Sequence, residues 1–184
     1  MKGLDRHLQK RRIQVALPWI PPGAHVLDVG CADGALFRLG RSKIPSGVGI
    51  DTRESETWAG EAYERRLGKF PDDLGPGDKF DAVAMLAVVE HVAAEELTRW
   101  AEAVPTILRP EGRLVITTPS PMVDHILDAG IKLRVIDGME AEEHHGFDPG
   151  EVPDIFAVAG MRLEHTSRFE LGLNHLFVFS ASAT

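Results

Sequence analysis

The sequence predicts an α/β fold with a mainly parallel, doubly wound sheet that ends in an antiparallel hairpin. Short apolar runs alternate with helix-length segments over residues 25–118. Runs such as 25–29 and 80–87 are almost continuously apolar, as in parallel strands that are buried on both faces. Two further strand-like runs, 161–169 and 174–180, follow one another directly. This order predicts a parallel sheet with helices on both faces and an antiparallel edge.

The individual elements follow from apolar periodicity and from proline and glycine punctuation. Residues 4–17 carry apolar side chains among basic ones and predict an amphipathic helix that stops at the prolines of 18–22. Residues 52–69 are ambiguous, part helix and part strand. The expected strands are 25–29, 47–51, 63–67, 80–87, 113–118, 161–169 and 174–180, and the other expected helices are 33–41, 93–108 and 149–159.

Length, charge and cysteine content narrow the class of protein. A chain of 184 residues is expected to form one domain, 1–184, whose N-terminal helix lies within 1–20. A net charge of −8 argues against nucleic acid as the main partner. A single cysteine, Cys31, and the lack of a long apolar run predict a cytoplasmic protein with no membrane span. A homodimer is left open, and the N-terminal helix is expected either to cap the cofactor or to pack on a partner.

Two glycine- and aspartate-bearing turns are the most informative feature. Residues 26–34 read Val-Leu-Asp-Val-Gly-Cys-Ala-Asp-Gly, and residues 48–51 read Val-Gly-Ile-Asp. Such turns at the carboxyl ends of neighbouring strands are typical of nucleoside-containing cofactors. The spacing departs from the dinucleotide pattern G-x-G-x-x-G, and Asp28 stands where it would repel a pyrophosphate. S-adenosylmethionine (SAM) carries an ammonium and a sulfonium but no phosphate, so acidic surroundings favour it.

Single residues of these turns have expected roles. Gly30 and Gly34 let the backbone turn and approach a ligand without a Cβ clash. The Asp51 carboxylate can accept hydrogen bonds from both ribose hydroxyls, although an aspartate after a strand can also cap a helix. Cys31 is interpreted as a small buried side chain of the loop and not as a nucleophile.

Two further stretches complete a family pattern. They are 80–92, around the fourth expected strand, and 108–114, Leu-Arg-Pro-Glu-Gly-Arg-Leu, which leads into the fifth. With 26–34 and 48–51, they make the chain resemble the class I SAM-dependent methyltransferases, in their small-molecule "type 11" group. The resemblance implies a Rossmann-like, seven-stranded sheet with a reversed last strand, SAM as cofactor, and methyl transfer to a small-molecule substrate.

The chain departs from that family at two positions. Ala32 stands where the family usually has glycine, and it is small enough to be tolerated. Lys69 stands where the family often has an aspartate near the adenine amine, so Asp72 or a backbone carbonyl is expected to replace it. The expected cofactor-binding residues are therefore Asp28, Gly30, Cys31, Ala32, Gly34, Asp51, Asp72, Met85 and Leu86.

The expected catalytic residues follow the fourth strand. Methyl transfer from SAM is an in-line displacement at carbon, so the protein must align the acceptor and remove its proton. Glu90 and His91 come just after the strand, and His91 is predicted to be the general base. A Glu-His pair here also resembles ubiquinone-pathway and small-RNA methyltransferases, in which it helps to hold a metal. One metal ligand of that pattern is replaced by Ala87, so no metal is predicted. The alternative is that the pair only opens the next helix.

A second histidine pair, His144 and His145, falls within 120–150, which is expected to cover the substrate site. By chain order this pair could converge with Glu90 and His91. The plain alternative is a helix packed on the sheet with polar loop histidines. Asn174 and His175 are further candidates for the rim of the pocket.

The sequence thus favours a SAM-dependent methyltransferase that acts on an oxygen or nitrogen nucleophile of a small molecule. The alternative is a catalytically inactive SAM-binding sensor or partner subunit, because the cofactor residues are clearer than the catalytic ones. The glycine spacing counts against a nicotinamide dehydrogenase. The acidic balance counts against a macromolecular substrate, although the Glu-His pair keeps an RNA 2′-hydroxyl open.

Overall fold

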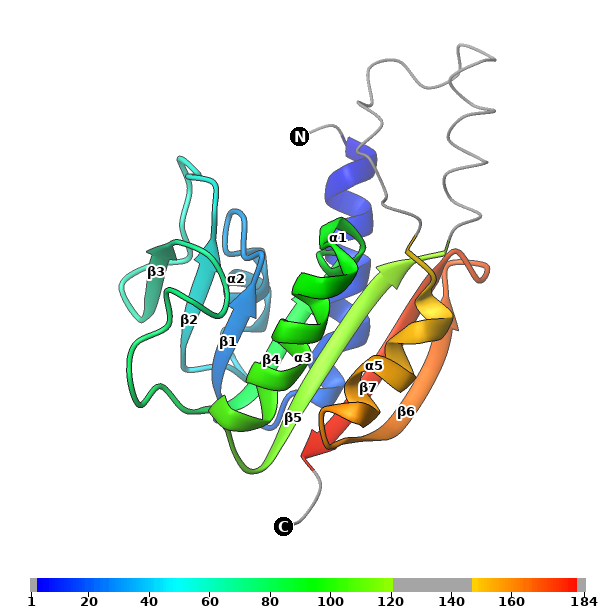
Figure 1. Cartoon of the computed structure of the whole chain (residues 1–184). Coiled ribbons are helices and arrows are strands. Elements are labelled where there is room, and N and C mark those ends of the chain that lie inside the picture. Colours follow the sequence, from blue (N-terminus) through cyan, green and yellow to red (C-terminus); the bar gives the residue numbers. More distant parts are fainter. Residues whose placement is uncertain (1–2, 121–146, 182–184) are drawn as a thin grey trace.

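One seven-stranded sheet organises residues 3–120 and 147–181, the part of the chain that this computed structural model describes. Its strand order is β3-β2-β1-β4-β5-β7-β6, and Figure 1 shows the sheet running through the whole molecule. The strands are β1 (His25–Val29), β2 (Ser46–Asp51), β3 (Tyr63–Leu67), β4 (Phe80–Leu86), β5 (Leu108–Pro119), β6 (Met161–Phe169) and β7 (Asn174–Ala181).

The strand directions confirm the predicted fold class. The neighbours β3, β2, β1, β4 and β5 are paired in parallel. Strand β7 lies between β5 and β6 and is antiparallel to both. The carboxyl ends of the five parallel strands therefore share one edge of the sheet, which is where α/β folds bind their ligands.

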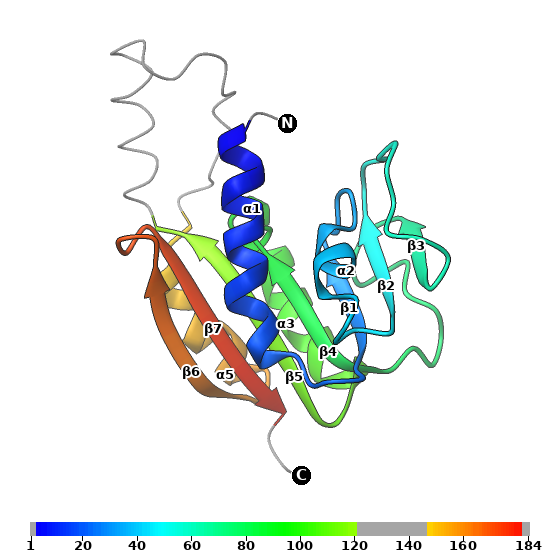
Figure 2. The same cartoon turned by 180° about the vertical axis from the view of Figure 1, so that it is seen from behind.

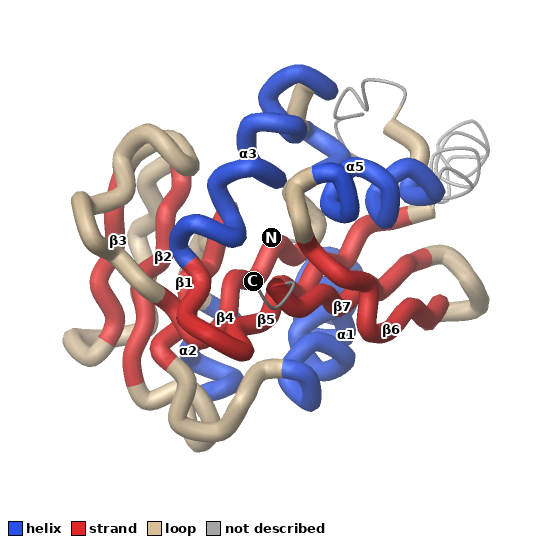
Figure 3. Tube along the Cα trace, turned by 60° about the horizontal axis from the view of Figure 1, so that its bottom comes forward, coloured by secondary structure: helices blue, strands red, loops and turns tan. Residues whose placement is uncertain are grey.

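Helices cover both faces of the sheet, so the molecule has three layers (Figures 2 and 3). Helices α1 (Gly3–Ala16) and α2 (Ala35–Gly40) cover one face, and α3 (Ala94–Ile107) and α5 (Val152–Val158) cover the other. The strands supply both cores by alternation: Val26 packs on the α1 and α2 side, whereas Leu27 and Val29 pack on the α3 and α5 side. Short 3-10 turns complete the described helices: η1 (Leu17–Trp19), η2 (Val89–His91) and η3 (Pro149–Glu151). None of these helices has the length and apolar character needed to cross a membrane.

The segment between β2 and β3 contains no helix, although part of 52–69 was expected to be helical. Its backbone is held instead by side chains. Arg65 donates hydrogen bonds to the carbonyl oxygens of Ser55 (2.6 Å) and Arg53 (3.2 Å), and Trp58 Nε1 donates to the carbonyl of Tyr63 (2.7 Å). The segment has no apolar stripe that a helix could bury, so these bonds stabilise it as a loop.

Among the element boundaries that differ from the expected ones, two have clear local reasons. Helix α2 begins at Ala35 because Gly34, just before it, is in the left-handed conformation (φ 70°). Strand β5 begins at Leu108 and includes the expected turn, where Glu111 has a φ of 63° and the register with β4 shifts. Neither change moves the carboxyl edge of the sheet.

Candidate functional site

A cavity lies between α1 and the carboxyl ends of β1 and β4. Helix α1 forms one wall, and the loop that connects β1 to α2 forms the other. The residues that line the cavity are Gln9, Arg12, Ile13, Asp28, Gly30, Cys31, Ala32, Ala35, Leu36 and Leu86. The structure thus brings together most of the residues that were expected, from sequence, to bind a cofactor.

The loop after β1 has a backbone that two glycines make possible. Gly30 (φ 71°) and Gly34 (φ 70°) are both left-handed. A Cβ on Gly30 would lie 2.7 Å from Cγ2 of Val88, and a Cβ on Gly34 would lie 3.0 Å from the ring of Trp58. Ala32 is left-handed as well (φ 45°) but has a Cβ. The loop therefore carries some backbone strain at Ala32.

Asp51, at the end of β2, fastens this loop to the sheet. Its Oδ2 accepts a hydrogen bond from the backbone N–H of Ala32 (2.9 Å), and its Oδ1 accepts one from the N–H of Arg53 (2.8 Å). The carboxylate is buried, at 9% exposure. Because each carboxylate oxygen has a second lone pair, Asp51 can still accept bonds from a ligand.

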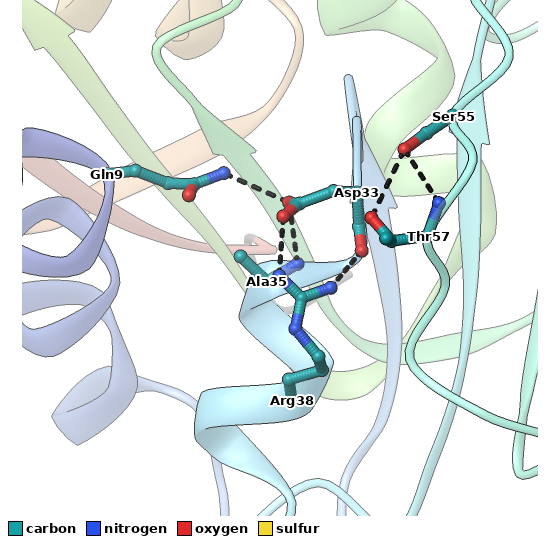
Figure 4. A network of polar contacts seen from close by, with 6 residues as sticks. All are labelled: Gln9, Asp33, Ala35, Arg38, Ser55 and Thr57. Atoms are coloured by element: carbon teal, nitrogen blue, oxygen red, sulfur yellow. Dashed lines mark hydrogen bonds and ion pairs between the residues drawn. The ribbon is translucent and has the colours of Figure 1, made fainter. Parts of the chain in front are cut away.

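Asp33 docks helix α1 on the same loop (Figure 4). Its Oδ1 accepts hydrogen bonds from Nε2 of Gln9 (3.1 Å) and from the N–H of Ala35 (3.2 Å). Its Oδ2 pairs with Nη2 of Arg38 at 2.5 Å. Figure 4 shows Gln9 reaching across from α1 to this aspartate, so the two walls of the cavity are joined directly.

Asp28 gives the cavity an unusual electrostatic character. Its side chain is only 4% exposed. Burial, together with the nearby charges of Asp51 and Asp33, raises the pKa of Asp28 to about 8. In the ligand-free protein this carboxyl is therefore largely protonated at neutral pH. A cation placed against it would favour the ionised form, so the site suits a positively charged ligand group.

Arg12 is a residue of the cavity that the sequence analysis missed. From the sequence it was only one of the basic side chains of the expected helix 4–17, but it lies four residues before the buried Ala16, on the face of α1 that packs on the sheet. Burial lowers the pKa of Arg12, and the charges of Glu90 and Glu170 offset part of that effect. The guanidinium stays charged. Its four-residue spacing from Ala16 was the signal that could have revealed it.

Four of the expected cofactor residues are not among those that line the cavity. Gly34 and Asp51 belong to the loop beside it and its anchor, whereas Met85 and Asp72 lie elsewhere. Met85 is fully buried in the core on the α3 side, because strand alternation turns it away from Leu86. Asp72 lies in the turn after β3 and pairs with Arg99 of α3 at 2.6 Å; both side chains are more than half exposed. Neither residue lines the cavity, so the structure does not place them as the sequence analysis expected.

Glu90 and His91 point in different directions. Both belong to η2, where successive residues are about 120° apart around the axis. Glu90 is buried, at 2% exposure, and its charge acts on Arg12, whereas His91 is exposed. His144 and His145 lie outside the described residues, as does most of the expected lid, 120–150. In the described ranges no group of three or more potential ligands could hold a metal.

Comparison with known proteins decides the family. The family described as "Methyltransferase domain" matches residues 2–166. The chain belongs to this methyltransferase family. Its fold is also that of 1,6-didemethyltoxoflavin-N1-methyltransferase from Burkholderia thailandensis, solved with 1,6-didemethyltoxoflavin and S-adenosylhomocysteine bound. The TM-score is 0.74 over 98% of this chain and 83% of that one, at 18% identity.

Curated relatives of this methyltransferase domain match over part of their length. Nocamycin O-methyltransferase of Saccharothrix syringae is 38% identical over 112 residues, which are 54% of this chain and 39% of that protein. Ubiquinone biosynthesis O-methyltransferase of Bartonella bacilliformis is 30% identical over 104 residues, 52% of this chain and 41% of that protein. The chain thus spans about two-fifths of the length of the curated relatives it matches.

The strain at Ala32 leads to a stability prediction. Glycine adopts a positive φ without the Cβ penalty, so Ala32→Gly should raise the free energy of unfolding by roughly 0.5–1 kcal/mol. Ala35→Gly is the matched control: Ala35 begins a helix, where glycine should instead lower stability by roughly 0.5–1 kcal/mol. Urea unfolding of both variants checks this. Equal losses in the two variants would contradict strain at Ala32.

The raised pKa of Asp28 leads to a pH prediction for the ligand-free protein. Its pKa rises from 3.8 to about 8 on folding, so ionisation opposes folding. The resulting loss in the free energy of unfolding is absent below about pH 4, grows between about pH 4 and 8, and is complete above about pH 8. Asp28→Asn cannot ionise. Its stability advantage over the wild type should therefore grow by about 1–3 kcal/mol between pH 6 and pH 9, as measured by urea unfolding.

Asp81→Asn is the control for that experiment. Partial burial raises the pKa of Asp81, but hydrogen bonds from the His25 N–H and from Arg109 outweigh it and lower the pKa overall. Asp81 is therefore ionised throughout this range, and its variant should differ from the wild type by a constant amount. A constant difference for Asp28→Asn too would show that Asp28 is already ionised at pH 6.

Proposed function

We propose that the chain is a SAM-dependent methyltransferase that acts on an oxygen or nitrogen nucleophile of a small-molecule acceptor. The observation that carries the proposal is the cavity in which Asp28 and Arg12 face one space from opposite walls, beside the glycine-rich loop. Membership of the methyltransferase family and the O-methyltransferase names of two relatives support this chemistry. The fold shared with a structure that binds S-adenosylhomocysteine (SAH) supports the cofactor.

The charges of the cavity fit the amino-acid end of SAM. Asp28, on β1, would ionise and accept a hydrogen bond from the ammonium, whose positive charge would offset the cost of burying the carboxylate. Arg12, on α1, would pair with the carboxylate through its parallel N–H groups. A zwitterionic group needs one partner of each sign, and these two walls supply them.

The nucleoside end of the cofactor fits the residues beyond the loop. Asp51 has lone pairs left for the ribose hydroxyls after it binds the N–H groups of Ala32 and Arg53. Because Gly30 and Gly34 have no Cβ, the backbone of the loop can lie close to the ligand. Leu86 adds an apolar wall at the end of β4.

Proton removal from the acceptor falls to the segment after β4. When bound, SAM supplies an activated methyl group on a sulfonium leaving group. His91 is exposed at the carboxyl edge of the sheet, where it can take a proton from an acceptor hydroxyl or amine. Glu90, buried beside the charge of Arg12, holds a carboxylate at the same edge. His144 and His145 remain proposed contributors to the acceptor site.

Calorimetric titration with SAM and SAH, with NAD as a negative control, tests the cofactor. Asp51→Ala should weaken SAH binding by about 1.5–3 kcal/mol, roughly 10- to 150-fold, through the loss of charged hydrogen bonds. Asp72→Ala removes a carboxylate that lies away from the cavity, so it should leave the affinity within about twofold. If the wild type binds neither SAM nor SAH, the proposed function is wrong.

Turnover tests the general base. The wild type is screened with phenols, catechols and amines for SAM-dependent release of SAH. His91→Ala should lower turnover about 100-fold with the acceptor that is found, while the SAH affinity stays unchanged. His165→Ala, which removes a histidine stacked on Trp19, should keep full turnover. Unaltered activity in His91→Ala would exclude His91 as the base, and SAM binding without any turnover would favour the sensor alternative.

A further inference from the structure

Asn174, the first residue of β7, is a buried polar side chain on the face of the sheet that α1 covers. It is only 3% exposed. Its Oδ1 accepts a hydrogen bond from Nε of Arg12 (3.3 Å), and its Nδ2 donates one to Oε2 of Glu170 (2.9 Å). These two bonds form a chain, Arg12–Asn174–Glu170, that links α1 to the turn between β6 and β7.

The turn between β6 and β7 holds Glu170 in a defined place. Glu170 (φ 51°) and Leu171 (φ 59°) are both left-handed, which is costly for residues with a Cβ. The N–H of Leu173 donates to the carbonyl of Glu170 (3.1 Å), and the N–H of Ser120 donates to the carbonyl of Leu173 (2.8 Å). The turn is thereby fastened to the end of β5, so the Glu170 carboxylate is a fixed reference point.

Glu170 decides which way the amide of Asn174 faces. A carboxylate accepts hydrogen bonds and does not donate them, so the NH₂ group of Asn174 must point to Glu170. The amide oxygen is therefore left facing Arg12. An amide turned the other way would place two acceptors against each other and an NH₂ group against a guanidinium.

Arg12 is held by one nitrogen and keeps the others for a ligand. In the described part of the chain, the bond from Nε to Asn174 is the only hydrogen bond of this guanidinium. The Nη1 and Nη2 groups thus remain available in the cavity that Arg12 lines. Without Asn174, the guanidinium would be drawn toward Glu90 or Glu170, whose charges already act on it.

We propose that Asn174 and Glu170 position Arg12, so that the turn between β6 and β7 sets how tightly the cavity holds a ligand carboxylate. The inference rests on the proposed function, because it takes that ligand to be SAM or SAH. Asn174 is a positioning residue that acts through Arg12 and does not touch the cofactor. The turn is thus part of the machinery that recognises the amino-acid end of the cofactor.

A pair of probes separates this role from a general effect on the fold. SAH carries the carboxylate, whereas 5′-methylthioadenosine keeps the adenine, ribose and thioether but lacks the amino-acid end. Asn174→Ala should weaken SAH binding by about 5- to 20-fold and leave 5′-methylthioadenosine within about twofold. Leu171→Ala is the control, because this side chain of the same turn is fully exposed; it should change neither affinity.

A double-mutant cycle tests whether Asn174 acts through Arg12. Arg12→Met alone should weaken SAH at least as much as Asn174→Ala, and adding Asn174→Ala to it should cost nothing further. Glu170→Ala tests the same chain without removing a buried residue, so it remains informative if Asn174→Ala fails to fold. It should weaken SAH about 2- to 5-fold and spare 5′-methylthioadenosine.

Two results would overturn the inference. One is an equal loss of affinity for both probes in Asn174→Ala or Glu170→Ala, which would indicate a general loosening of the cavity. The other is additive loss in the Arg12→Met and Asn174→Ala double variant. Either result leaves the proposed function standing when the wild type binds SAH. A wild type that does not bind SAH overturns the proposed function instead.

Discussion

The hydrogen bond from the N–H of Ala32 to the carboxylate of Asp51 is the contact on which the cofactor loop depends. It joins the loop after β1 to the end of the neighbouring strand β2 at 2.9 Å. It also brings the Asp51 charge near Asp28, so that the bond that shapes the loop helps to raise the pKa of its buried neighbour. The Asp51 carboxylate therefore contributes to the geometry of the loop and adds to the effect of burial on the pKa of Asp28.

Most strands could be predicted from local apolar runs, and the seven-stranded sheet with a reversed last strand followed from the family resemblance. Parallel strands buried on both faces are mostly apolar, and the apolar residues of a run such as 25–29 are most stable inside such a sheet. The prediction of a helix within 52–69 was wrong because tertiary contacts determine the conformation of this segment. Arg65 bonds to backbone carbonyls that would otherwise accept hydrogen bonds within a helix. A sequence pattern reveals apolar periodicity, but it does not reveal that a long side chain will donate hydrogen bonds to backbone carbonyls.

The site residues show the same contrast between positions set by local sequence order and positions set by tertiary packing. Asp28, Gly30 and Ala32 follow directly from the strand end, so sequence order places them correctly in the cavity. Arg12 was missed because its role depends on how α1 crosses the sheet, and the local signal for it is only its four-residue spacing from the buried Ala16. Met85 and Leu86 show the sensitivity to register: adjacent residues of one strand face opposite layers, and only Leu86 reaches the cavity. Asp72 was chosen to replace the aspartate that the family often has after the third strand, but it is exposed and pairs with Arg99 of α3.

The position of β7 between β5 and β6 affects the order in which the protein can assemble. Arg12 and its partner Asn174 are 162 residues apart in the chain, so a ribosome must release nearly all of this sequence before they can meet. Until then, β5 has an open edge, and α1 has nothing to hold its guanidinium. Closing so large a loop is entropically costly and slow compared with the local β/α pairings. The local β/α pairings, including the loop after β1, can therefore form before the contact between Arg12 and Asn174, which must wait for β7.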